Sequence, residues 1–134
     1  MNYIPQQKIK TYLKLKGELA LYVGIGSYFE STTFEWIHFY EGEPEDEGEV
    51  YVAKLVQSFD EGSTSTYYVD DFQTVEELED EEGESDISFI ESDFDNCIKW
   101  IVSEHNGDLN KFVTIDDLDS IYLKLAEQGE LGHH

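Results

Sequence analysis

The chain has 134 residues, enough to bury the core of one domain, and its 40% hydrophobic and 14% aromatic content argues against global disorder. Its eight basic residues are all lysines, and against 31 carboxylates they leave a net charge of −23. Such a charge argues against direct binding to nucleic acid or to an anionic membrane, because both would repel it. We therefore expect one acidic domain over residues 1–134 that meets a basic partner.

Cysteine usage and the apolar runs indicate the compartment. Cys97 is the only cysteine, so no intrachain disulfide framework exists, and we expect a buried thiol in a reducing environment. The first residues lack the charged-then-apolar pattern of a secretory signal, and no apolar run approaches the roughly 18 residues of a membrane span. The sequence thus predicts a cytoplasmic location.

Two alternating patterns open the chain. In residues 8–16, lysines alternate with mostly apolar residues, Lys8, Lys10, Lys14 and Lys16 against Ile9, Thr11, Leu13 and Leu15. This period of two predicts a β-strand over residues 8–16 with the lysines on one face. A turn at Gly17 and a second alternation over residues 19–25 then predict a hairpin.

Three further segments have strand character. Residues 33–40 are rich in β-branched and aromatic types and predict a strand that is buried on much of both faces. Residues 50–59 and 66–72 predict two more strands, separated by a turn at residues 60–63. Because short turns join these segments, we expect an antiparallel meander of about five strands.

The last third of the chain changes to helical periodicity. One apolar stripe, behind a cap at Ser92 or Asp93, runs through Phe94, Cys97, Ile98, Ile101 and Val102. A second, behind a cap at Thr114, runs through Leu118, Ile121, Tyr122 and Leu125. Strands followed by helices predict an α+β fold with both C-terminal helices packed on one face of the sheet.

Negative charge is concentrated in the middle of the chain. Residues 41–95 hold 21 of the 31 carboxylates and one lysine, Lys54, and residues 76–86 alone hold eight. As a helix this run would carry about one charge per 2 Å, close to the roughly 1.7 Å spacing of duplex DNA. Thr74 and Glu77 form a capping-box pattern, so a short helix is expected to begin there and to fray into a mobile acidic segment by Gly83.

A surface for a basic partner follows from this charge. Tyrosines beside carboxylates suit a lysine- or arginine-rich surface, because aromatic rings attract cations. Tyr40 and Tyr51 lie beside the acidic loop at residues 41–49, and Tyr67 and Tyr68 precede a pair of aspartates. The predicted partner-binding residues are Glu43, Glu45, Asp46, Glu47, Tyr67, Tyr68, Asp70, Asp71, Glu76, Glu77, Glu79, Asp80, Glu81, Glu82, Glu84 and Asp86.

The segment 106–117 resembles the calcium loop of an EF-hand. Oxygen donors at loop positions one, three, five and twelve would be Asn106, Asp108, Asn110 and Asp117. The pattern departs from the family at three positions. Position one has asparagine where the family has aspartate, position six has Lys111 where the family has the turn glycine, and position twelve has aspartate where the family has the longer glutamate. An ordinary connection between two helices is the preferred interpretation, with these residues as a weak metal candidate.

The residues do not indicate catalysis. Cys97 lies on an apolar helix face, and the His38 and His105 positions place no base beside it. We predict no enzyme and no cofactor, but an acidic binding or inhibitor protein that docks on and occludes a nuclease, a toxin or a nucleic-acid-binding protein, as immunity proteins and nucleic-acid mimics do. The alternatives are a protein that responds to divalent cations and an acidic domain adapted for solubility. The second alternative ranks lower because residues 1–40 carry a net charge of +1.

Overall fold

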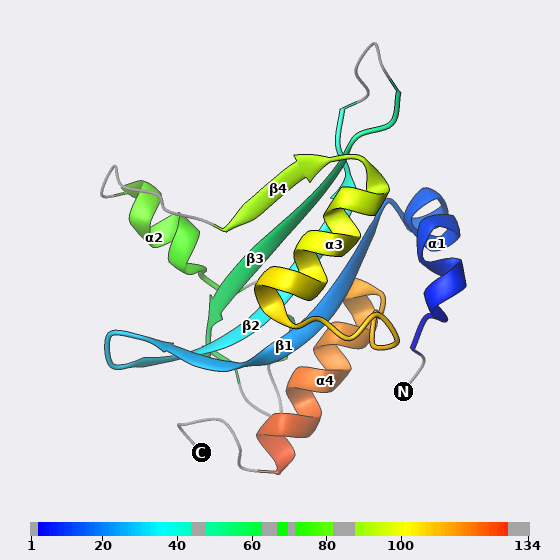
Figure 1. Cartoon of the computed structure of the whole chain (residues 1–134). Coiled ribbons are helices and arrows are strands. Elements are labelled where there is room, and N and C mark those ends of the chain that lie inside the picture. Colours follow the sequence, from blue (N-terminus) through cyan, green and yellow to red (C-terminus); the bar gives the residue numbers. More distant parts are fainter. Residues whose placement is uncertain (1–2, 44–47, 63–66, 70–71, 82–87, 129–134) are drawn as a thin grey trace.

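The computed structural model describes residues 3–43, 48–62, 67–69, 72–81 and 88–128. Its elements follow the order η1 (Gln6–Lys8), α1 (Ile9–Lys16), β1 (Glu18–Tyr28), β2 (Ser31–Glu41), β3 (Tyr51–Phe59), α2 (Val75–Glu81), β4 (Phe89–Ser92), α3 (Phe94–His105) and α4 (Ile115–Glu127). The fold is α+β, and the strands form one antiparallel meander in the order β1-β2-β3-β4 (Figure 1).

The predicted strands are only partly correct. The strands expected at residues 19–25, 33–40 and 50–59 are confirmed as β1, β2 and β3. The strand expected at residues 66–72 is absent from the described part of that segment, where Tyr67 to Val69 and Phe72 are outside any strand. The fourth strand is β4, which was not expected and pairs with β3 from Tyr51↔Ser92 to Lys54↔Phe89.

The first predicted strand is wrong, because residues 9–16 form helix α1, and with it the predicted N-terminal hairpin is lost. Ile9 and Leu13 are four residues apart and both are buried, whereas Leu15, which a strand would place on the same face, is 73% exposed. Gly17 then ends the helix in the left-handed region at φ 81°, and its N–H donates to the carbonyl of Leu13 at 2.7 Å.

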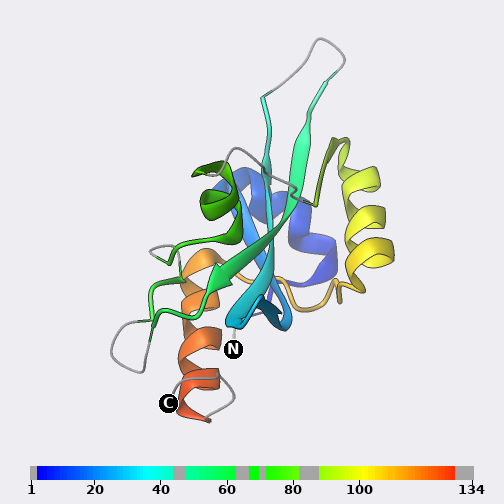
Figure 2. The same cartoon turned by 90° about the vertical axis from the view of Figure 1, so that its left-hand side faces the viewer.

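The C-terminal helices lie on opposite faces of the sheet, so the prediction that they share one face is wrong (Figure 2). Alternate residues of β1 and β2 divide the core between the two faces. Leu21 and Ile37 pack with Ile101 of α3, together with residues of α1. Phe34 and Trp36 pack with Leu118 and Tyr122 of α4, among others. The sheet is therefore the middle of three layers.

The predicted helix starts are confirmed by their caps. The Asp93 carboxylate accepts from the N–H of Asn96 at 2.8 Å, and Thr114 Oγ1 accepts from the N–H of Asp117 at 3.3 Å. At α2, Thr74 Oγ1 accepts from the N–H of Glu77 at 3.1 Å. The expected fraying at Gly83 falls on residues outside the described part of the chain.

Candidate docking surface

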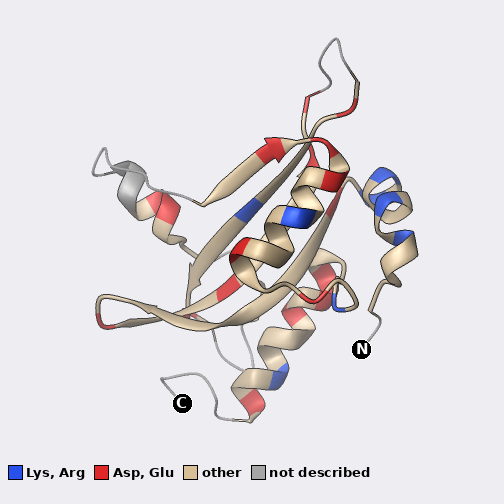
Figure 3. Cartoon of the chain, viewed as in Figure 1, with Lys and Arg blue, Asp and Glu red and all other residues tan. Residues whose placement is uncertain are grey.

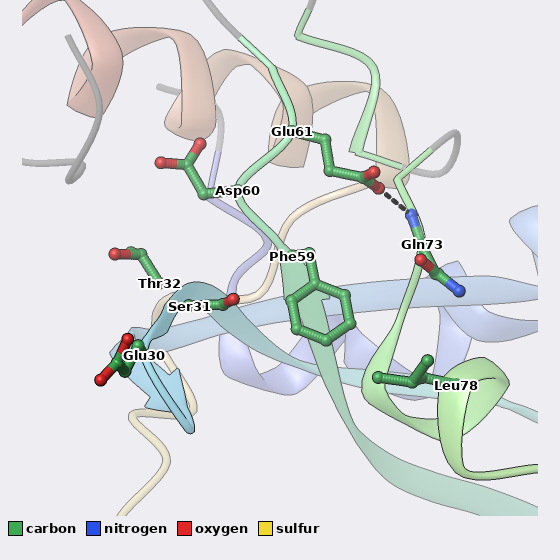
Figure 4. A pocket seen from close by; sticks show the side chains of 8 residues that line it. All are labelled: Glu30, Ser31, Thr32, Phe59, Asp60, Glu61, Gln73 and Leu78. Atoms are coloured by element: carbon green, nitrogen blue, oxygen red, sulfur yellow. Dashed lines mark hydrogen bonds between the residues drawn. The ribbon is translucent and has the colours of Figure 1, made fainter. Parts of the chain in front are cut away.

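A pocket of about 520 Å³ opens where β2 begins and β3 ends (Figure 4). The turn between β1 and β2, the loop after β3 and helix α2 surround it. Its lining residues are Glu30, Ser31, Thr32, Phe59, Asp60, Glu61, Gln73 and Leu78. Phe59 and Leu78 supply an apolar wall, and the remaining side chains are polar or acidic.

Backbone pairing fixes the loop that carries two of the acids. The N–H of Asp60 donates to the carbonyl of Thr32 at 3.1 Å, and the N–H of Phe59 donates to the carbonyl of Gln73 at 2.8 Å. The segments before and after the loop are therefore tied to the start of β2 and to the approach to α2. The sheet thus sets the backbone positions of Asp60 and Glu61.

The hydroxyl of Tyr122 in α4 forms two hydrogen bonds to this loop. This buried hydroxyl donates to the carboxylate of Asp60 and accepts from the N–H of Gly62 at 3.1 Å. Burial, followed by the hydrogen bond to Asp60, raises the pKa of the Tyr122 phenol well above its usual range. The phenol therefore stays neutral and remains a hydrogen-bond donor to Asp60.

The pocket retains a net negative charge. Glu61 accepts from the N–H of Gln73, which is again a neutral donor (Figure 4). Glu30 stands across the pocket from Glu61, and no lysine is among the eight residues that line it. Two of the carboxylates, Glu30 and Glu61, together with the ring of Phe59 can accommodate an ammonium or guanidinium group, because both ring and acids attract cations.

Helix α2 extends this surface. Leu78 reaches the pocket, so the predicted acidic run begins at the pocket's edge. Glu76 pairs with Lys54 of β3 at 3.1 Å, and Glu77 is exposed. The N-terminus of the helix stabilises both acids, since they lie in its first turn. We define the docking surface as the turn at residues 29–30, the pocket and the first turn of α2.

Half of the lysines lie on the other side of the molecule. Four of the eight lysines are in η1 and α1, whereas α2 and the turn between β1 and β2 are at the opposite side in Figures 1 and 3. Acids of the described residues also occur on β4, α3 and α4 (Figure 3). The described charge is thus uneven because half of the lysines are gathered in η1 and α1 (Figure 3).

The structure separates the two predicted acidic regions. Glu43 is exposed beyond the far end of β2, and the pocket lies at the start of that strand. An 11-residue strand spans about 35 Å, so Glu43 and α2 belong to different ends of the sheet. The backbone of Glu79, Asp80 and Glu81 completes α2, but their side chains lie outside the described structure, as do Glu45, Asp46, Glu47, Asp70, Asp71, Glu82, Glu84 and Asp86.

The tyrosines divide into exposed and buried members. Tyr67 and Tyr68 stack at 5.3 Å, and Tyr68 is exposed while Tyr67 packs partly on the core around α4. Tyr51 was expected at the surface but is 1% exposed, and its hydroxyl donates to Glu49 at 2.9 Å, so that expectation is wrong. Tyr40 is half-buried.

Sequence reasoning missed Phe29, Glu30, Asp60 and Glu61. The available signal was the dipeptide Phe29-Glu30 between two alternating patterns, where a turn usually carries glycine or asparagine. The register of β2 with β3, in which Thr33 pairs with Phe59, places this dipeptide beside residues 60–61.

The calcium-like loop has local roles for its donors. Asn106 ends α3 at φ 51°, and Asp108 Oδ1 accepts from the N–H of Asn110 at 2.9 Å. Asp117 lies in the first turn of α4, which packs on the opposite sheet face from α3. Within the described residues, no three His, Cys, Asp or Glu side chains gather as metal ligands would. An ordinary connection between the two helices stays the preferred prediction, with calcium binding as the weak alternative.

Cys97 is buried as expected. Its thiol lies 3.5 Å from the carbonyl oxygen of Tyr51, and burial raises the pKa of this thiol to about 11. A thiol protonated in this way is a poor nucleophile at neutral pH.

Comparison of the chain with protein-family models, with curated proteins and with solved structures finds no match in any of the three. Among the helices of the described residues, none combines the length and the apolar character that crossing a bilayer requires.

Proposed function

We propose that this protein binds a basic protein and occludes its cationic surface, which would neutralise a nuclease, a toxin or a nucleic-acid-binding protein. The observation that carries the proposal is the pocket at residues 30, 60 and 61 with α2 at its edge, on the side away from the lysines of α1. Binding there needs no catalytic group.

The physical steps are steering and then contact. A net charge of −23 attracts a cationic protein over roughly a Debye length of 8–10 Å, so association is fast at low salt and slows as salt rises. The lysines on α1 would disfavour docking by that side. The partner then contacts the docking surface, where Glu30, Glu61 and Glu77 can pair with its cations.

Two triple variants of equal charge test the proposal. Glu30→Gln, Glu61→Gln and Glu77→Gln neutralise the docking surface, and Glu91→Gln, Glu104→Gln and Glu127→Gln neutralise exposed acids of β4, α3 and α4. Each set changes the net charge by +3, so any difference between the two sets reports position and not total charge. The probe is a poly-L-lysine of defined length, measured by fluorescence anisotropy at low salt.

We expect the first variant to lose about tenfold in affinity and the second to lose much less, because near-surface pairs contribute up to about 1 kcal/mol each. Melting temperatures of both variants confirm that the fold is intact. Equal losses would contradict a localised docking surface and would favour acids that serve solubility.

A further inference from the structure

The turn between β1 and β2 carries an exposed aromatic residue. Tyr28 pairs with Ser31, so Phe29 and Glu30 are the two connecting residues of the hairpin. Phe29 is 86% exposed and has φ 54°. This left-handed backbone region favours glycine or asparagine, and a bulky side chain there is uncommon. Neither local conformation nor burial in the fold explains phenylalanine at this position.

The exposed ring of Phe29 packs against a neighbouring aromatic ring. It lies edge-on to the ring of Tyr28, with 4.7 Å between the ring centroids. Tyr28 is in turn edge-on to Phe59, with 6.0 Å between their ring centroids. Phe59 is part of the apolar wall of the pocket. A chain of three aromatic rings therefore leads from the tip of the hairpin to the pocket.

The tip and the pocket are also continuous in sequence. Glu30 follows Phe29 directly, and its carboxylate lines the pocket together with that of Glu61. Aromatic residues are enriched at the cores of protein interfaces, and a few anchors that become buried on binding carry most of the binding energy. The pocket volume of about 520 Å³ lies within the range of sites that hold a side chain or a small ligand.

We propose that the hairpin tip and the pocket form one bipartite site for a basic protein partner. Phe29 packs into an apolar patch of that partner, and a lysine or arginine side chain beside the patch enters the pocket. The cation of this side chain faces Glu30 and Glu61, and its aliphatic stem lies on Phe59 and Leu78. The inference rests on the proposed function and adds to it the kind of epitope that the protein recognises.

Charge complementarity selects this occupant. Membrane insertion could also use an exposed phenylalanine, but Glu30 beside it and Glu61 in the pocket would be repelled by anionic headgroups. A neutral or acidic protein would leave these carboxylates without cationic partners on binding. A basic surface with an apolar centre satisfies both parts of the site.

The test uses two synthetic decapeptides of equal charge. Each has six cationic residues, and the remaining four are leucine in one peptide and serine in the other. Affinities are measured for the wild-type protein, for Phe29→Ser and for the matched control Phe89→Ser, whose ring on β4 is 53% exposed. Phe29→Gly serves as a second variant because its backbone conformation favours glycine. Phosphatidylcholine vesicles are a parallel probe.

We expect the wild-type protein to bind the leucine peptide at least about tenfold more tightly than the serine peptide. Both Phe29 variants should lose this preference, and Phe89→Ser should keep it. A preference that survives in the Phe29 variants would overturn the bipartite site, as would vesicle binding that depends on Phe29.

The two proposals fail in different ways. If the serine peptide binds with salt dependence but Phe29 has no effect, the bipartite site is wrong and the acidic docking function stands. If neither peptide binds the wild-type protein at low salt, both proposals are wrong.

Discussion

Tyr122→Phe is the most informative single change to the frame of the pocket. The substitution keeps the buried ring, which packs against Phe34 and Phe72 at 5.4 and 5.0 Å, and removes only the hydroxyl. The carboxylate of Asp60 then loses a donor, and the N–H of Gly62 loses an acceptor. The packing is unchanged, so the loss reports these two hydrogen bonds.

The expected destabilisation follows from their types. A hydrogen bond to a charged group contributes about 1.5–3 kcal/mol, and one to a neutral backbone group about 0.5–1.5 kcal/mol. We therefore expect the free energy of unfolding to fall by about 2–4 kcal/mol. Urea denaturation followed by tryptophan fluorescence measures it, since Trp36 is buried in the same cluster as Tyr122.

Tyr68→Phe is the control. Because Tyr68 is 57% exposed, this substitution should change the free energy of unfolding by no more than about 0.5 kcal/mol. The same Tyr122 variant should also bind poly-L-lysine more weakly, because residues 60–62 lose their support. A Tyr122→Phe protein as stable as the wild type would refute the structural role assigned to this hydroxyl.

Three further outcomes are expected. Thr74→Ala should destabilise α2 by about 1 kcal/mol, seen as faster amide exchange at Glu77, because the cap to its N–H is lost; unchanged exchange would contradict the cap. Cys97 should react with a disulfide reagent at about pH 8 only after unfolding, since its pKa of about 11 keeps the buried thiol protonated; prompt reaction of the native protein would show that it is accessible. Stability should fall as pH rises above about 10, because the raised pKa of Tyr122 lets the folded state keep a proton that the unfolded chain releases; this decline should be smaller in Tyr122→Phe, and an equal decline would contradict the assignment.

Strand and helix periodicity predicted the centre of the fold but not its start. In residues 8–16 the lysine alternation fits a strand, yet Ile9 and Leu13 also fit one helical face. A helix buries both Ile9 and Leu13 on one face, and Gly17 ends it in the left-handed region. A nine-residue segment with both periods is ambiguous without its tertiary contacts.

The three-layer arrangement could have been predicted from the pattern of one strand, β2. Residues 33–40 were expected to be buried on both faces, and the structure shows Phe34 and Trp36 on one face with Ile37 and Phe39 on the other. A strand buried on both faces needs a layer on each, so two helices on a single face are inconsistent with it. β4 could not be predicted, because its four residues alternate without a buried member.

Of the candidate site, sequence indicated the start of α2 and its acids. The pocket brings together residues 30–32, 59–61, 73 and 78, which are far apart in the chain and meet only through the β1–β2–β3 register. Counting carboxylates along the sequence pointed to residues 76–86 and did not identify Glu30, which is a single acid in a turn. Proximity in the fold, and not charge density, defines the pocket.

An amide chemical-shift titration with poly-L-lysine tests the central claim most directly. On a ¹⁵N-labelled sample at low salt, the account predicts the largest shifts at residues 29–32, 60–62 and 73–78, and their loss when salt is raised several-fold. Shifts spread evenly over β4, α3 and α4, or confined to them, would contradict a docking surface at the pocket and α2.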